Sequence, residues 1–215
     1  MGGGRTPGAL GGEGGESFEG DAPITRGGFA DPGPIGLKGG GARFIDRKVA
    51  NVTNDWTPPS PATTPDIVVG GSTLEQVGNQ LNKQGEWGKG GGQITFDPIP
   101  AGNSPTVDVN LHGGLVKILP QWLGYSSASA AVKKEWDKMI GKLDAHEQRH
   151  VEIAIEVADK LAQDLVGKSI DSIAPMVTAA NARMKARQDQ MDTASDHGAK
   201  AGVPYGDVIL DTTIT

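Results

Sequence analysis

Cysteine is absent from the 215 residues of this chain, and aromatic residues and long apolar runs are scarce. Without cysteine there are no disulfides and no thiolate ligands, so a bound metal must rely on imidazole and carboxylate groups. No segment approaches the roughly 18 apolar residues of a membrane-spanning helix, and the N-terminus lacks the apolar stretch of a signal peptide. A net charge of −6, without a basic patch interleaved with aromatic residues, argues against a nucleic-acid partner. We therefore expect neither a membrane span nor nucleic-acid binding.

Glycine and proline, by contrast, are abundant and unevenly distributed. About half of the 33 glycines fall within the first 41 residues, and residues 57–65 are rich in proline. A segment of this composition buries too little apolar surface to offset its conformational entropy. We therefore predict a flexible tail and linker over residues 1–65 and a folded domain over residues 66–215.

The most informative segment is His146-Glu147-Gln148-Arg149-His150, which is a His-Glu-x-x-His motif. Residues four apart lie one turn above each other on a helix, so both imidazoles could bind one zinc ion. Glu147 would then lie beside the metal, where it could act as the general base for a water molecule. The motif thus predicts metal-assisted hydrolysis, most often of peptides.

The motif lies within a helical pattern. Apolar residues recur with a 3.6-residue period from Val132 to Leu165, and His146 and His150 fall on the same stripe. Burying two imidazoles costs free energy unless each has a polar partner, and one metal ion would supply a partner to both. The alternative is a pair of core histidines bonded to backbone carbonyls or water, with Glu147 in solvent.

A catalytic zinc site needs a third protein ligand and an open position for water. A second helical pattern begins at Ile170 and would return antiparallel to the first, with His197 near its end, before Gly198. His197 would then come close to the metal, and we favour it as the third ligand. Asp192 and Asp196 are the alternatives for this position, or else the groups that orient a ligand imidazole.

Between the linker and the motif, the sequence predicts a helix over residues 72–85 and strands over residues 93–96, 106–111 and 115–119. A turn at His112 would join the last two strands, and residues 208–215 favour a further strand. The predicted fold class is therefore α+β. A small antiparallel sheet packs on the long zinc-motif helix and on a second antiparallel helix, and a Gly/Pro-rich disordered tail precedes them. An edge strand of this sheet could pair with an extended substrate.

Three segments together resemble a known bacterial family. Leu119-Pro120-Gln121-Trp122, the His-Glu-x-x-His helix and residues 191–198 are similar to domain-of-unknown-function family 922, whose members are described as secreted zinc-dependent proteases. The resemblance covers about residues 66–200 and supports His197 as third ligand. Met191 replaces a family tyrosine and Ser195 a family threonine, so no phenol is expected at the first position, whereas Ser195 keeps a hydroxyl.

These observations predict a zincin-like metallopeptidase. Zn²⁺ would be held by His146, His150 and His197, and Glu147 would take a proton from water and return it to the leaving amine. The oxyanion needs a further donor. The candidates for it are Tyr205, Tyr125, His112 and Arg149.

The expected partner is a peptide or protein substrate, and the tail could engage a secretion or injection machine. Because the family is described as secreted, we expect export by a route without a signal peptide, or otherwise a cytoplasmic location. Two other functions remain open. One is a non-catalytic, zinc-stabilised binding or cargo module, and the other is a zinc hydrolase of a non-peptide amide such as a peptidoglycan cross-link.

Overall fold

The structure is a computed structural model that describes residues 48–54, 67–100 and 106–215. Its helices are α1 (Leu74–Gln84), α2 (Ala130–Leu165) and α3 (Ile173–Ser195), with short 3-10 helices η1 (Tyr125–Ser127) and η2 (Ile170–Ser172). Its strands are β1 (Lys48–Asn54), β2 (Val68–Val69), β3 (Lys89–Gly91), β4 (Ile94–Pro100), β5 (Thr106–Gly113), β6 (Val116–Ile118) and β7 (Gln121–Trp122). The described residues all belong to one compact unit, Phe44–Thr215. None of the helices in these residues is both long and apolar enough to cross a bilayer.

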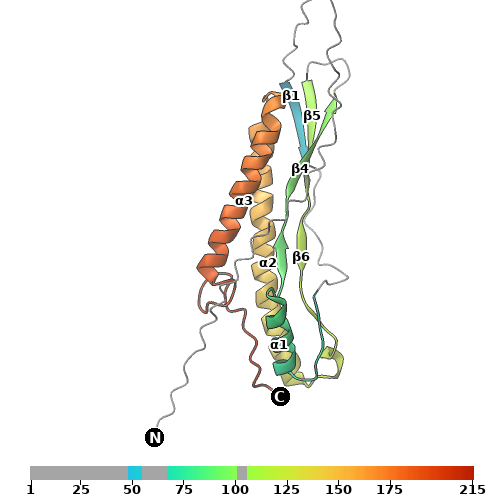
Figure 1. Cartoon of the computed structure of the whole chain (residues 1–215), viewed down its shortest axis with the longest axis vertical. Helices are drawn as coiled ribbons and strands as arrows, with labels where there is room; N and C mark the ends of the chain where they lie inside the picture. The colour runs from blue at the N-terminus through green and yellow to red at the C-terminus, as the bar shows by residue number, and fades with distance from the viewer. Residues whose placement is uncertain (1–47, 55–66, 101–105) are drawn as a thin grey trace, which may run out of the picture. The chain divides into compact units, whose positions relative to one another are not determined.

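Helix α2 is the element on which the others pack. Its 36 residues give a length of roughly 54 Å at about 1.5 Å per residue. Ser129 caps its N-terminus by accepting a hydrogen bond from the N–H of Val132 at 3.3 Å. Figure 1 shows α3 and strands β1, β4 and β5 beside one half of α2, and α1 beside the other half. The predicted α+β class, with small sheets on a long helix and a second antiparallel helix, is confirmed.

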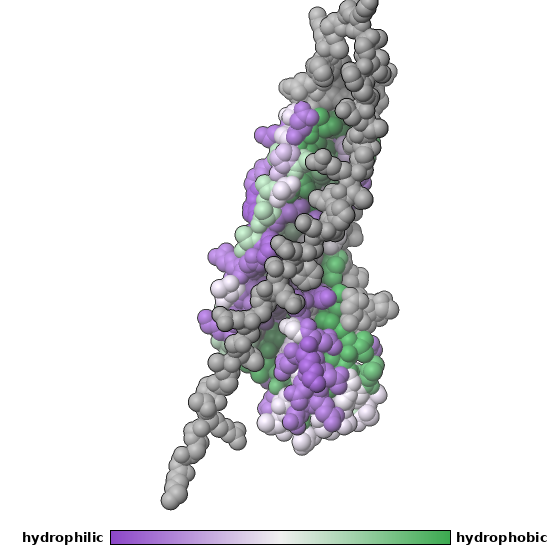
Figure 2. All heavy atoms as spheres, in the orientation of Figure 1, coloured by the Kyte–Doolittle hydropathy of each residue, from purple (hydrophilic) through white to green (hydrophobic). Residues whose placement is uncertain are grey.

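The apolar interior is divided into two clusters along α2. The first cluster, here the upper core, joins the C-terminal half of α2 to α3 and the β1-β5-β4 sheet, and it includes Ile153. The second, the lower core, joins the N-terminal half of α2 to α1, β2 and β7, and it includes Leu143 and Trp122. The exposed face of α1 is hydrophilic (Figure 2). His146 and His150 lie between Leu143 and Ile153, so the motif falls where one core ends and the other begins.

Strands β3, β4, β5 and β6 form one long antiparallel hairpin with an interruption. Ile94 pairs with Gly113 and Gly91 pairs with Val116, so the β4–β5 and β3–β6 ladders share one register. The N–H of Gly114 donates to the carbonyl of Gln93 at 3.0 Å across the interruption. The predicted turn at His112 is therefore wrong: the chain runs straight on from β5 to β6. The sequence misled because Gly113-Gly114 is typical of a turn, whereas here the pair lies in an extended chain. The close approach of the two backbones is at Gly92 on the opposite arm of the hairpin, where a Cβ atom would lie 2.8 Å from the carbonyl oxygen of Gly114.

Strand β1 pairs in parallel with β5, so the three-stranded sheet is mixed, with the order β1-β5-β4. Its residues, Lys48–Asn54, fall within residues 1–65, for which the sequence predicted a tail and linker, and they form a strand of this sheet. The other residues of 1–65 lie outside the described part of the chain. The predicted domain boundary at residues 65 and 66 therefore stays a prediction.

The C-terminal segment is not the strand that its alternating residues indicated. Within the described part of the chain, residues 208–215 pair with no strand. Val208 and Leu210 are instead buried in the lower core, and the N–H of Asp211 donates to Oε1 of Glu135 on α2 at 3.0 Å. The predicted helix over residues 72–85 is confirmed, since Thr73 caps α1 and Gly85 ends it with a φ of 79°.

Asn181 fastens α3 to the sheet. Its side-chain oxygen accepts from the N–H of Ile94 at 2.9 Å, and its amide nitrogen donates to the carbonyl of Ile94 at 2.8 Å. The amide of Asn181 thus acts as a neighbouring strand would, and it satisfies both backbone groups of a buried residue.

We predict that Asn181→Ala lowers the free energy of unfolding by about 1–3 kcal/mol, because it leaves the N–H and carbonyl of Ile94 without these partners. Urea unfolding followed by circular dichroism measures this loss. Lys185→Ala, which removes an exposed ion pair with Asp189 on the same helix, is the matched control and should cost less than about 0.5 kcal/mol. Equal losses in the two variants would contradict the role assigned to Asn181.

Candidate metal centre

The polar residues of the motif are buried at the junction of the two cores. The exposed fractions are 5% for His146, 5% for Glu147 and 8% for His150. The period of α2 places all three residues inside the domain, as the sequence predicted for the two histidines. Helix α3 runs antiparallel to α2 and brings Asp192, near its C-terminal end, to the same place. Glu147 therefore does not lie in solvent, as it would in the alternative with two core histidines.

Three ligand atoms converge on one point. Nε2 of His146 lies 3.3 Å from Nε2 of His150, and Oδ1 of Asp192 lies 3.3 Å from the former and 3.1 Å from the latter. Among the described residues, these three side chains form the one group of three or more His, Cys, Asp or Glu whose ligand atoms all lie within 4.8 Å of one another. They form an almost equilateral triangle of two nitrogen atoms and one oxygen atom.

The triangle has the dimensions of a metal site. Metal–ligand bonds of about 2.0–2.1 Å at a tetrahedral angle put neighbouring ligand atoms roughly 3.3 Å apart. The observed separations of 3.1–3.3 Å match this value. Two imidazoles and a carboxylate are also a donor set that binds divalent transition metals. The His146, His150 and Asp192 group could therefore hold a divalent metal ion.

The hydrogen bonding of His146 favours a cation in the triangle. Nδ1 of His146 lies 2.9 Å from the backbone carbonyl oxygen of Tyr205, which can only accept, so this nitrogen carries the proton. In the neutral ring, Nε2 then presents a lone pair to the carboxylate of Asp192. Two lone pairs facing each other repel unless a proton or a metal ion lies between them. Burial lowers the pKa of His150 below its ordinary value, which also keeps that imidazole in the neutral form that metals bind.

Glu147 carries a carboxyl group into this buried layer. Burial raises its pKa to about 8, and the negative charges of Asp192 and Glu86 add to this effect. A nearby cation would lower the pKa again, since it favours the charged form. A buried carboxyl group whose proton affinity lies near neutrality has the property that a general base or acid requires.

Glycines of the β3 segment cover Glu147. A Cβ atom added at Gly88 would lie 2.7 Å from Oε1 of Glu147, and one added at Gly90 would overlap the backbone oxygen of Glu147 and lie 2.8 Å from Oε2. Strand β3 therefore lies against α2 at a separation that only glycine permits. The sequence carried this signal as the glycine cluster at residues 88–92, although its connection to Glu147 could not be seen without the fold.

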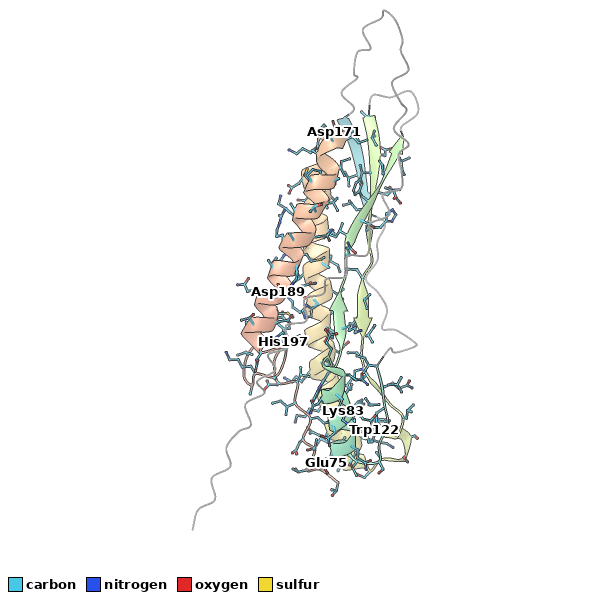
Figure 3. The ribbon with its side chains drawn as sticks, in the orientation of Figure 1. Glu75, Lys83, Trp122, Asp171, Asp189 and His197 are labelled. Atoms are coloured by element: carbon cyan, nitrogen blue, oxygen red, sulfur yellow. The ribbon has the colours of Figure 1, made fainter. Side chains whose placement is uncertain are left out.

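His197 lies at the C-terminal end of α3 (Figure 3). Its side chain is exposed and does not belong to the group of three, although its charge is close enough to lower the pKa of His150. Asp196 is exposed as well. The structure thus places Asp192, the alternative third ligand, beside the two histidines. A role of His197 as a ligand stays a prediction. Ser195 keeps the end of α3 in place, since its hydroxyl donates to the carbonyl of Met191 at 2.9 Å and accepts from the N–H of Gly198 at 3.2 Å.

The four candidates for the oxyanion contact lie in different places. Tyr125 donates its hydroxyl to Asp137 near the start of α2, and His112 pairs with Asp97 on the sheet. Arg149 forms ion pairs with Glu152 at 3.0 Å and Glu156 at 2.7 Å. Tyr205 lies beside the metal group, but the atom that contacts His146 is its backbone carbonyl oxygen and not its phenol.

Comparison with known protein families shows to which family the chain belongs. The model of the bacterial protein of unknown function DUF922 matches residues 66–198, which is more than half of the chain, and the chain therefore belongs to this family. The resemblance inferred from the sequence is confirmed. Neither the curated proteins nor the solved structures include a match. The matched description is that of a bacterial protein of unknown function, so the protease activity expected from the resemblance stays a prediction.

We predict that Gly90→Ala lowers the free energy of unfolding by about 1–3 kcal/mol, because the new methyl group overlaps the backbone of α2 at Glu147. Gly141→Ala is the matched control: it lies on α2 with no atom within 4 Å of the new Cβ, and it should stabilise the protein by up to about 1 kcal/mol. Urea unfolding with a chelator present measures both. A Gly90→Ala variant as stable as the wild type would contradict the close packing of β3 on Glu147.

Proposed function

We propose that this protein is a zinc-dependent metallopeptidase in which His146, His150 and Asp192 hold the metal and Glu147 is the general base. The observation that carries the proposal is the triangle of ligand atoms, with sides of 3.1–3.3 Å, on the same turn of α2 as a buried carboxyl group. Three protein ligands leave the fourth tetrahedral position for water, which is the arrangement of catalytic zinc sites.

A zinc ion in this group would supply a Lewis acid that makes water a competent nucleophile near neutral pH. The residues of the chain account for the proton movements. Glu147 accepts the proton of the attacking water and delivers it to the amine that leaves when the amide bond breaks. Without a metal the pKa of Glu147 is about 8. A nearby cation would lower this pKa toward neutral pH. The proton thus goes from water to Glu147 and then to the leaving group, and the net change is addition of one water to one amide bond.

Strand β3 supports a peptide as the substrate. Within the described residues it pairs with β6 alone, so its other edge has no strand partner and an extended backbone could add to it. Because Gly88 and Gly90 contact the side chain of Glu147, a peptide added to this edge would run close to the general base. Engagement of a secretion machine by residues 1–65 remains a prediction.

A second candidate function is a non-catalytic module stabilised by zinc. The low exposure of all three motif residues favours it, because structural metal sites are closed to solvent. The two functions differ in whether the metal accepts a substrate. They can therefore be separated by measuring metal content and hydrolysis on the same preparations.

We predict that the wild type binds about one zinc per chain and cleaves peptides in a chelator-sensitive reaction. Glu147→Gln should retain the zinc and lose cleavage by about 100-fold or more, because it removes the general base. Asp192→Ala should weaken zinc binding by more than roughly 10–100-fold, which is the typical loss when the mutated residue only hydrogen-bonds to a metal ligand. Elemental analysis, a competition assay for zinc and a peptide-library cleavage assay measure these effects.

Asp189→Ala is the matched control, since it removes an exposed carboxylate from the preceding turn of α3, and it should change neither zinc binding nor cleavage. His197→Ala tests the rival ligand. Loss of zinc in this variant with zinc retained in Asp192→Ala would overturn the assignment of Asp192. Stoichiometric zinc with no cleavage in any preparation would favour the structural module, and an absence of bound zinc would contradict the proposal as a whole.

A further inference from the structure

His146 has two ring nitrogen atoms, and the chain uses them differently. Nε2 belongs to the ligand triangle, whereas Nδ1 lies 2.9 Å from the backbone carbonyl oxygen of Tyr205. A carbonyl oxygen only accepts, so this contact fixes the proton on Nδ1 and leaves Nε2 free to bind a metal. It also fixes the orientation of the ring. The group that prepares His146 as a ligand is therefore the peptide unit that follows Tyr205.

The backbone around Tyr205 is held in an uncommon conformation. Tyr205 has a φ of 61° and Asp207 has a φ of 63°, both in the left-handed region that non-glycine residues rarely adopt. Between them, Gly206 passes so close to Lys200 that a Cβ atom would overlap the carbonyl oxygen of Lys200. Such a conformation persists only where the surroundings enforce it, and it clusters at functional sites.

The surroundings of Tyr205 enforce it from both sides. The N–H of Asp207 donates to the carbonyl of Lys200 at 3.1 Å, and the N–H of Val208 donates to the carbonyl of Gly198 at 2.9 Å. The carboxylate of Asp207 accepts from the N–H of Gly202 at 3.1 Å. Further along, the segment is anchored in the lower core by Val208 and Leu210 and on α2 by the bond from Asp211 to Glu135. We refer to residues 205–211 as the C-terminal strap.

The strap also contacts the motif helix through a side chain. The guanidinium carbon of Arg149 lies 5.9 Å from the centre of the Tyr205 ring. Arg149 is in turn fixed by Glu152 and Glu156 on α2. The family match ends at residue 198, so the strap that orients His146 lies outside it.

We propose that Tyr205, through its backbone carbonyl, is a positioning residue of the metal centre, and that the C-terminal strap holds this carbonyl in place. The inference rests on the proposed metal site, but its first consequence does not require a metal. His146 should carry its proton on Nδ1 in the metal-free protein. The strap should raise metal affinity because the ring is already oriented, with an unprotonated Nε2, before the metal binds.

The experiment reads the protonated nitrogen of His146 directly in the full-length protein. Long-range ¹H–¹⁵N correlation spectra of the imidazoles distinguish the two neutral tautomers, and single His→Gln variants assign the four histidines. Zinc affinity is measured in parallel by competition with a chromophoric chelator. Circular dichroism confirms that each variant is folded.

Two variants displace the carbonyl and one keeps it. Tyr205→Pro cannot adopt a φ of 61°, and Gly206→Ala cannot keep its approach to Lys200, so both should move the proton to Nε2 or mix the tautomers. Both should also weaken zinc binding by roughly 10–100-fold. Tyr205→Asn separates the ring from the carbonyl, since asparagine tolerates the left-handed region while it removes the ring, and it should keep the Nδ1–H tautomer. Ile209→Ala is the matched control, because it removes an exposed side chain from the same strap, and it should keep both the tautomer and the zinc affinity of the wild type.

A wild-type His146 that is protonated on Nε2 would overturn the proposal at once, whatever the variants do. So would a folded Tyr205→Pro or Gly206→Ala protein with the wild-type tautomer and affinity. Loss of the tautomer in Tyr205→Asn would assign the role to the ring and not to the carbonyl. If the wild type binds no zinc but shows the Nδ1–H tautomer, then the proposed function fails while the positioning role of Tyr205 stands.

Discussion

Two imidazoles and a carboxylate meet in the interior between α2 and α3, and the cost of burying them shapes what surrounds them. His146 and His150 occupy core-facing positions of a helix that is apolar on both sides of them, and Asp192 comes from the neighbouring helix. Groups of this kind are stable in an apolar interior only when each has a partner. A divalent cation would pair with all three at once and would join α2 to α3 where the upper and lower cores meet. The same ion would make the buried Glu147 easier to ionise, so binding and chemistry would depend on one charge.

The surrounding elements serve this polar layer by close approach of their backbones. Strand β3 lies on Glu147 because Gly88 and Gly90 have no side chain. The turn after α3 lies on Val208, beside His146, because Gly198 has none: a Cβ atom there would lie 2.9 Å from Cγ2 of Val208. Close backbone contact excludes water from the site, which strengthens every electrostatic interaction within it. In this account, the glycine-rich β3 segment and the strained C-terminal turn are parts of the site, although none of their side chains is a ligand.

Local patterns were enough to predict the helices and the motif, whereas long-range pairing was not accessible from the sequence. The 3.6-residue period placed His146 and His150 on the buried stripe of α2, and Gly85 marked the end of α1. The pairing of β6 with β3 depends on a register that runs through Gly113 and Gly114, and a glycine pair indicates a turn more often than a continuous extended chain. Asp192 and His197 lie within two turns of one helix end, and only the rotation of α3 against α2 distinguishes them. The role of the Tyr205 carbonyl leaves no signal in the sequence, because every residue has a backbone carbonyl.

The most direct test of the account is an anomalous-difference map at the zinc absorption edge, from crystals of the protein loaded with zinc. We expect one strong peak per chain, about 2.0–2.2 Å from Nε2 of His146, Nε2 of His150 and a carboxylate oxygen of Asp192. No peak at this position, or a peak bound elsewhere on the chain, would contradict the metal centre and with it the hydrolytic function.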